Sequence, residues 1–146
     1  MRDVRDAVLI GRDTKGAVIR RPISPFMIPT AYRPQLTSVL SISNRLAGIA
    51  LCAGTALAVW WLLALAVGAG AFATVRAVTL SPIGLILVAL WVLALVYHTL
   101  GGIRHLVWDA GHGFDLPMVH RTGWAVIIAT IVLTALLWVV GAWLLA

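Results

Sequence analysis

The stretch that decides the fold is the first long apolar run, residues 46–72, which reads LAGIALCAGTALAVWWLLALAVGAGAF and holds no charged side chain. A helix needs about 20 apolar residues to cross a hydrocarbon core of roughly 30 Å, so this run predicts a transmembrane helix with length to spare. Residues 82–103 and 124–146 are of the same kind, and Pro82 can occupy the first turn of its helix. The sequence therefore predicts an all-α membrane protein with three spans, at about 41–70, 82–107 and 122–145.

The composition agrees with a chain whose solvent is largely lipid. Of the 146 residues, 62% are hydrophobic and 11% are charged, and the mean hydropathy is +1.01. A soluble domain carries roughly 25% charged residues, so this chain has too few to cover a surface in water. The single cysteine, Cys52, lies inside an apolar run and is expected to pack as a small apolar residue.

Residues 1–37 form a polar, basic segment ahead of the spans. Four prolines interrupt it and disfavour a long helix: Pro22, Pro25, Pro29 and Pro34. We therefore expect an extended arm over 1–37 that packs on another surface, followed by a transmembrane domain over 38–146. No apolar stretch follows the first charges, so the segment does not have the pattern of a cleaved signal peptide.

The basic residues are concentrated at one end of the chain. Eight of the eleven precede or open the first span: Arg2, Arg5, Arg12, Lys15, Arg20, Arg21, Arg33 and Arg45. This distribution favours the positive-inside arrangement over a nucleic-acid-binding face. The expected connection 73–81 has one basic residue and the connection 104–121 has two, so we expect the arm and the second connection on the cytoplasmic side and the C-terminus on the opposite side.

His98 is the main candidate for chemistry, because an ionisable residue within a span is costly and often functional. Gly102 and His105 lie four and seven residues further on, so the three residues share one helical face. Imidazole can ligate haem iron, and a glycine leaves room for the porphyrin edge. His105, beside Arg104 near the membrane surface, could help to neutralise haem propionates. Alternatively, His98 makes a polar contact between helices.

The number of histidines bears on any haem site. Only His98 lies at a suitable depth in the membrane, so a haem held by two histidines would need its second ligand from another polypeptide. A zinc site in the second connection is an alternative, since His105 and Asp109 have i, i+4 spacing and His112, Asp115 and His120 follow. Nothing fixes the ligand set, however, and a solvated loop is the default interpretation.

A second group of residues opens the first span. Ser41, Asn44, Arg45 and Gly48 are spaced at offsets of 3, 4 and 7 and share one face of the helix. A hydroxyl and a guanidinium near the membrane surface could bind the carbonyl oxygens of a quinone and stabilise the charge it gains on reduction. Alternatively, Ser41 assists the helix start and Arg45 reaches lipid phosphates.

Both groups occur in the same order in one known family. Over about residues 20–145 the chain resembles the cytochrome b membrane-anchor subunit of succinate dehydrogenase. The family's first signature, roughly R-P-x-S-P followed by S-I-x-H-R-x-[ST]-G, is similar to residues 21–25 and 41–48. The second, H-x-x-x-G-x-R-H-L-x-W-D-x-G, is matched by His98, Gly102, Arg104, His105, Leu106, Trp108, Asp109 and Gly111.

Two positions depart from the first signature. Asn44 stands where the family usually has His, and Ala47 stands where it often has Ser or Thr. Asn can donate a hydrogen bond but carries no positive charge near neutral pH. A propionate-pairing or proton-handling role is therefore not expected to transfer to Asn44.

The resemblance implies a specific set of roles. His98 would be one axial ligand of haem b, with the second from another small anchor subunit, and His105 and Arg45 would lie near the propionates. Ser41 and Arg45 would line a quinone site, and no residue of this chain would be catalytic in the strict sense.

The resemblance also implies a place for the chain. It would be a non-autonomous subunit of succinate dehydrogenase (quinone) in a bacterial or mitochondrial inner membrane. Its partners would be a second anchor subunit, an iron–sulfur subunit and a flavoprotein carrying FAD. Two alternatives stay open: the anchor of a fumarate reductase, and a haem-free scaffold or transporter subunit.

Overall fold

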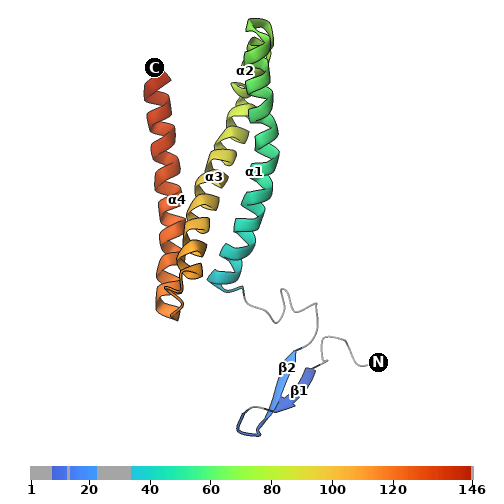
Figure 1. Cartoon of the computed structure of the whole chain (residues 1–146), viewed down its shortest axis with the longest axis vertical. Coiled ribbons are helices and arrows are strands. Elements are labelled where there is room, and N and C mark those ends of the chain that lie inside the picture. Colours follow the sequence, from blue (N-terminus) through green and yellow to red (C-terminus); the bar gives the residue numbers. More distant parts are fainter. Residues whose placement is uncertain (1–7, 13, 23–33, 146) are drawn as a thin grey trace, which may run out of the picture. The chain divides into compact units, whose positions relative to one another are not determined.

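The computed structural model describes residues 8–12, 14–22 and 34–145. The chain divides into two compact units, Met1–Gln35 and Leu36–Ala146, which are described here one at a time. Figure 1 labels the elements in chain order: β1 (Val8–Arg12), β2 (Val18–Pro22), α1 (Leu36–Val67), α2 (Ala69–Thr79), α3 (Pro82–Asp109) and α4 (Leu116–Leu145).

The first unit contains an antiparallel hairpin of β1 and β2. Val8 pairs with Pro22 at its open end, and Arg12 pairs with Val18 beside the connecting loop. Gly16 in that loop has φ 81°, a left-handed conformation that glycine adopts at little cost. An extended arm was expected over residues 1–37, and the pairing of these strands was not predicted. Two of its prolines, Pro25 and Pro29, lie outside the described residues.

The prediction of three spans is confirmed. Helices α1, α3 and α4 are long and apolar enough to cross a membrane, with mean hydropathies of 2.1, 2.3 and 2.6 in their most apolar windows. Two of them begin earlier than predicted, α1 at Leu36 rather than near residue 41 and α4 at Leu116 rather than near 122. The early start of α4 has a local cause, because Asp115 Oδ2 accepts a hydrogen bond from the backbone N–H of Met118 at 3.3 Å.

The connections between the spans are shorter than predicted, because much of the sequence expected in them is helical. The first connection, expected over 73–81, belongs mostly to α2, which follows a break at Gly68 with φ 131°. Trp61 holds α2 against α1: its ring meets Phe72 edge-on at 4.8 Å, and its Nε1 donates to Thr79 Oγ1 at 3.3 Å. Pro82 lies in the first turn of α3, as predicted.

Within the second unit, α3 lies beside both α1 and α4 (Figure 1). The start of α1, the end of α3 and the start of α4 lie together at one end of the bundle, whereas α2 lies at the other end (Figure 1). Only 6%, 6% and 11% of the residues in the most apolar windows of the three spans are buried. Most of the apolar surface therefore faces outward, where lipid or other subunits must cover it.

Candidate functional site

The His98 side chain projects from α3 onto α1, where it is half-buried. Its Nδ1 lies 3.0 Å from the backbone carbonyl oxygen of Asn44. The ring lies against Gly48, one helical turn further along α1: an added Cβ at that residue would be 3.2 Å from His98 Cε1. The glycine that faces the imidazole is therefore Gly48. Gly102, on the same helix as His98, has open space where its side chain would be.

This contact determines which ring nitrogen carries the proton. A carbonyl oxygen can only accept a hydrogen bond, so Nδ1–H is the donor in the neutral imidazole. Nε2 then carries the lone pair, and it has no hydrogen-bond partner among the residues that the structure describes. Metal-binding histidines have this arrangement, in which one nitrogen donates to a carbonyl and the other binds the metal. The geometry of His98 thus fits an axial ligand.

A small cavity of about 140 Å³ lies where α1 begins and α3 ends. The polar and charged residues of its lining include Thr37, Ser41, Asn44, Tyr97, Arg104 and His105. The Tyr97 hydroxyl donates to the Leu40 carbonyl at 3.1 Å. Asn44 Oδ1 is buried, with no hydrogen-bond partner in the described part of the chain. The polar side chains on its wall, and not this closed-off oxygen, make the cavity suitable for a polar occupant.

Arg104 lies between this cavity and α4, and its side chain is 9% exposed. Its Nε donates to Thr122 Oγ1 at 3.0 Å, and its Nη2 donates to the Val119 carbonyl at 2.9 Å. The guanidinium also lies 4.0 Å from the centre of the Trp108 ring, a cation–π distance. No carboxylate pairs with it in the residues described. The buried guanidinium of Arg104 therefore links α3 to α4 through its hydrogen bonds. This role was not predicted from the sequence.

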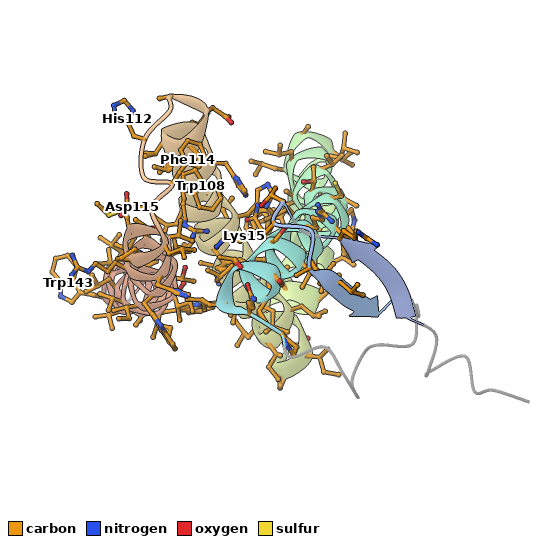
Figure 2. The ribbon with its side chains drawn as sticks, turned by 90° about the horizontal axis from the view of Figure 1, so that it is seen from below. Lys15, Trp108, His112, Phe114, Asp115 and Trp143 are labelled. Atoms are coloured by element: carbon orange, nitrogen blue, oxygen red, sulfur yellow. The ribbon has the colours of Figure 1, made fainter. Side chains whose placement is uncertain are left out.

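The turn after α3 is ordered by aromatic contacts. Trp108 Nε1 donates to the Gly113 carbonyl at 3.2 Å, and the Trp108 ring stacks with Phe114 at 6.4 Å. Figure 2 shows the bundle from this end, with Trp108 and Phe114 together and His112 pointing away from the helices. Trp143 projects outward from α4 in the same view (Figure 2).

The structure groups the expected site residues differently from the prediction, because one cavity has both Ser41 and His105 in its lining. Ser41 lines the cavity, whereas Arg45 is exposed on α1 and is not part of its lining. His105 is exposed, lines the cavity and meets the Trp108 ring edge-on at 5.2 Å. The zinc alternative gains no support, because no three His, Cys, Asp or Glu side chains come together among the described residues.

The fold and this site define a class of protein: a helical membrane protein with three candidate spans, a half-buried histidine between two of them, and a basic, polar cavity at one end of the bundle. A comparison with known families agrees with this class. Residues 18–137 match the family described as succinate dehydrogenase/fumarate reductase transmembrane subunit, and the chain belongs to that family.

Three relatives illustrate the match. The chain is 40% identical over 120 residues to the succinate dehydrogenase cytochrome b556 subunit of Rickettsia conorii, covering 82% of this chain and 92% of the relative. The subunit of the same name from Paracoccus denitrificans is 40% identical over 116 residues, covering 80% and 88%. The mitochondrial cytochrome b560 subunit of Bos taurus is 39% identical over 124 residues, covering 81% and 70%.

Proposed function

We propose that this chain is the cytochrome b membrane anchor of a succinate:quinone oxidoreductase, where it holds haem b and helps to pass electrons from an iron–sulfur subunit to quinone. The relatives at 38–40% identity are named as cytochrome b subunits of succinate dehydrogenase, which supports haem b as the cofactor. When bound, the haem supplies one-electron transfer within the membrane.

The observation that carries the proposal is the contact between His98 Nδ1 and the Asn44 carbonyl at 3.0 Å. It orients the imidazole and leaves Nε2 for iron. A second histidine ligand, if the haem needs one, would come from the other small anchor subunit, because the other three histidines of this chain lie at the end of α3 or beyond it. His105, at the end of α3, contributes a hydrogen-bond donor toward the propionates.

The quinone is the substrate, and the start of α1 supplies its site. The Ser41 hydroxyl, on the cavity wall, donates to a quinone carbonyl oxygen. The exposed Arg45 guanidinium, one turn along α1 and outside the cavity lining, would attract the negative charge that the quinone gains on reduction. It would also be available to pair with a haem propionate.

The outward apolar faces of the helices support assembly with further subunits, since the spans bury so little against each other. These partners are a second small anchor, the iron–sulfur subunit and a flavoprotein that carries FAD. The end of the bundle that contains Arg45, Arg104 and Arg121 faces the cytoplasm or mitochondrial matrix, and the end with the single Arg76 faces the other side. This orientation puts the N-terminus inside and the C-terminus outside an inner membrane.

Co-purification tests the proposal directly. The chain is tagged, solubilised in mild detergent and analysed by mass spectrometry and visible spectroscopy of the same sample. The expected result is a b-type spectrum together with a flavoprotein, an iron–sulfur protein and a second small membrane protein. A stable, colourless preparation of the chain alone would contradict the proposal and support a scaffold.

A substitution tests the ligand. His98→Ala removes the nitrogen for iron, so we expect the haem content of the purified complex to fall sharply. Substitution of the exposed His112 by Ala is the matched control and leaves the haem content unchanged. Full haem occupancy in the His98→Ala complex would exclude His98 as a ligand.

A further inference from the structure

We propose that Gly48 is a positioning residue for the haem ligand. Because it has no side chain, the imidazole of His98 can lie against α1, where Nδ1–H reaches the Asn44 carbonyl and Nε2 is kept for iron. This inference rests on the proposed function. It states that a residue of α1 determines the orientation of a haem ligand that belongs to α3.

The first argument is the space around Gly48. An added Cβ would lie 3.2 Å from His98 Cε1, 3.7 Å from Nδ1 and 3.9 Å from Nε2, and these ring atoms are its three nearest neighbours. A separation of 3.2 Å is tighter than ordinary van der Waals contact, so the ring would have to shift by a few tenths of an ångström. A methyl group at residue 48 would therefore contact the His98 ring more closely than any other side chain.

The second argument is that the helices cannot easily move apart instead. On one side of His98, the Tyr97 hydroxyl donates to the Leu40 carbonyl at 3.1 Å. On the other side, Trp91 Nε1 donates to the Leu51 carbonyl at 3.4 Å. Both bonds join α3 to α1, one on either side of the imidazole, and they oppose separation of the two helices. A substitution at Gly48 is relieved by rotating or tilting the ring.

The third argument concerns what a tilted ring loses. The 3.0 Å bond from Nδ1 to the Asn44 carbonyl orients the ring and makes Nε2 a stronger donor to a metal. A stronger donor favours the oxidised form of haem iron and lowers its reduction potential. A weakened bond therefore has two effects: the haem is held less tightly, and its potential becomes more positive.

A purely structural role makes a different prediction. Small residues are common where transmembrane helices approach closely, and a glycine that served only packing would affect stability alone. The haem potential and spectrum of a properly assembled complex would then be unaffected by its substitution. The two roles are separated by measurements on the haem.

The test is Gly48→Ala in the whole complex. Gly141→Ala in α4 is the matched control, because an added Cβ there meets nothing within 4 Å. We expect Gly48→Ala to shift the haem midpoint potential to more positive values and to lower the affinity for haem, measured by its transfer to an external acceptor protein, by up to ~10-fold, the lower end of the range for mutated partners of metal ligands. A potential and a haem-loss rate equal to those of the Gly141→Ala complex would overturn the inference.

A double-mutant cycle keeps the test decisive if Gly48→Ala reduces assembly. With His98→Ala the ring is gone, so Gly48→Ala should have no further effect on the amount or thermal stability of the membrane-inserted chain. An equal effect of Gly48→Ala in both backgrounds would identify a packing residue and overturn the inference. Haem retained by His98→Ala would instead refute the proposed function, so the two failures are distinguishable.

Discussion

The indole ring of Trp91 on α3 covers Gly54 on α1 so closely that a Cβ at residue 54 would overlap Trp91 Cδ1. The same ring donates from Nε1 to the Leu51 carbonyl at 3.4 Å. The close approach of α1 and α3 at mid-membrane therefore depends on the missing side chain of Gly54.

We expect Gly54→Ala to destabilise the assembled protein by about 1–3 kcal/mol, the usual cost of overpacking a well-filled interior. The measurement is the midpoint of thermal unfolding in detergent, with Gly141→Ala as control. Adding Trp91→Leu to Gly54→Ala should restore part of the loss, because it removes the overlapping ring. An unchanged midpoint in Gly54→Ala would mean that α1 and α3 lie further apart at Gly54 and Trp91 than the structure places them.

Arg104 gives a second prediction, about the joint between α3 and α4. Arg104→Leu removes two hydrogen bonds from a charged donor and the contact with Trp108, and we expect a loss of about 2 kcal/mol in stability. Arg121→Leu, at an exposed residue of α4, is the control and should be nearly neutral. Thermal unfolding of the two variants side by side gives the comparison, and equal midpoints would contradict the assigned role.

Replacement by valine should have different effects on protein stability at two buried threonine hydroxyls. Thr79 accepts a hydrogen bond from Trp61 Nε1, so Thr79→Val leaves that donor unpaired and should cost about 1 kcal/mol. Thr134 Oγ1 is buried without a partner among the described residues, so Thr134→Val should be neutral or stabilising. Thermal unfolding again provides the readout. A loss on Thr134→Val would indicate that a neighbouring subunit satisfies this hydroxyl.

Arg45→Leu tests the quinone site. We expect it to lower quinone reduction at least tenfold while leaving succinate oxidation by an artificial dye unchanged, because the dye takes its electrons upstream of the membrane. Arg76→Leu, also an exposed arginine but on α2 at the other end of the bundle, is the matched control. Equal loss of both activities in Arg45→Leu would point to failed assembly rather than a damaged site.

The spans were predictable because hydrophobic length alone determines them. Their ends were harder to predict: α1 begins at Leu36, and Asp115 provides an N-terminal cap for α4 among polar residues that read as a loop. Helix α2 was not predicted: residues 69–72 belong to the same apolar run as the first span, and residues 73–81 were taken as a connection. The β1–β2 hairpin was not predicted, because Pro22 ends β2 and three more prolines follow it in the sequence, a pattern typical of an extended segment.

The candidate site was predicted by residue type but not by geometry. An ionisable residue in a span singled out His98, and the spacing along one helix suggested Gly102 as the residue that leaves room for a porphyrin edge; the structure has open space there. The contact of the imidazole with Gly48, 50 residues away in the chain, was not predicted, because it depends on how two helices cross rather than on a helical repeat. The position of the Arg104 side chain likewise depends on residues of another helix, Thr122 and Val119, so the spacing of residues within α3 could not predict it.

The partner of His98 Nδ1 is main chain, and this bears on which substitutions residue 44 can accept. Every amino acid carries the carbonyl, so a change of the side chain at residue 44 leaves the acceptor in place. The contact with the imidazole is therefore insensitive to the identity of residue 44. The side chain of Asn44 belongs instead to the wall of the neighbouring cavity, and its replacement changes the cavity without removing the partner of His98.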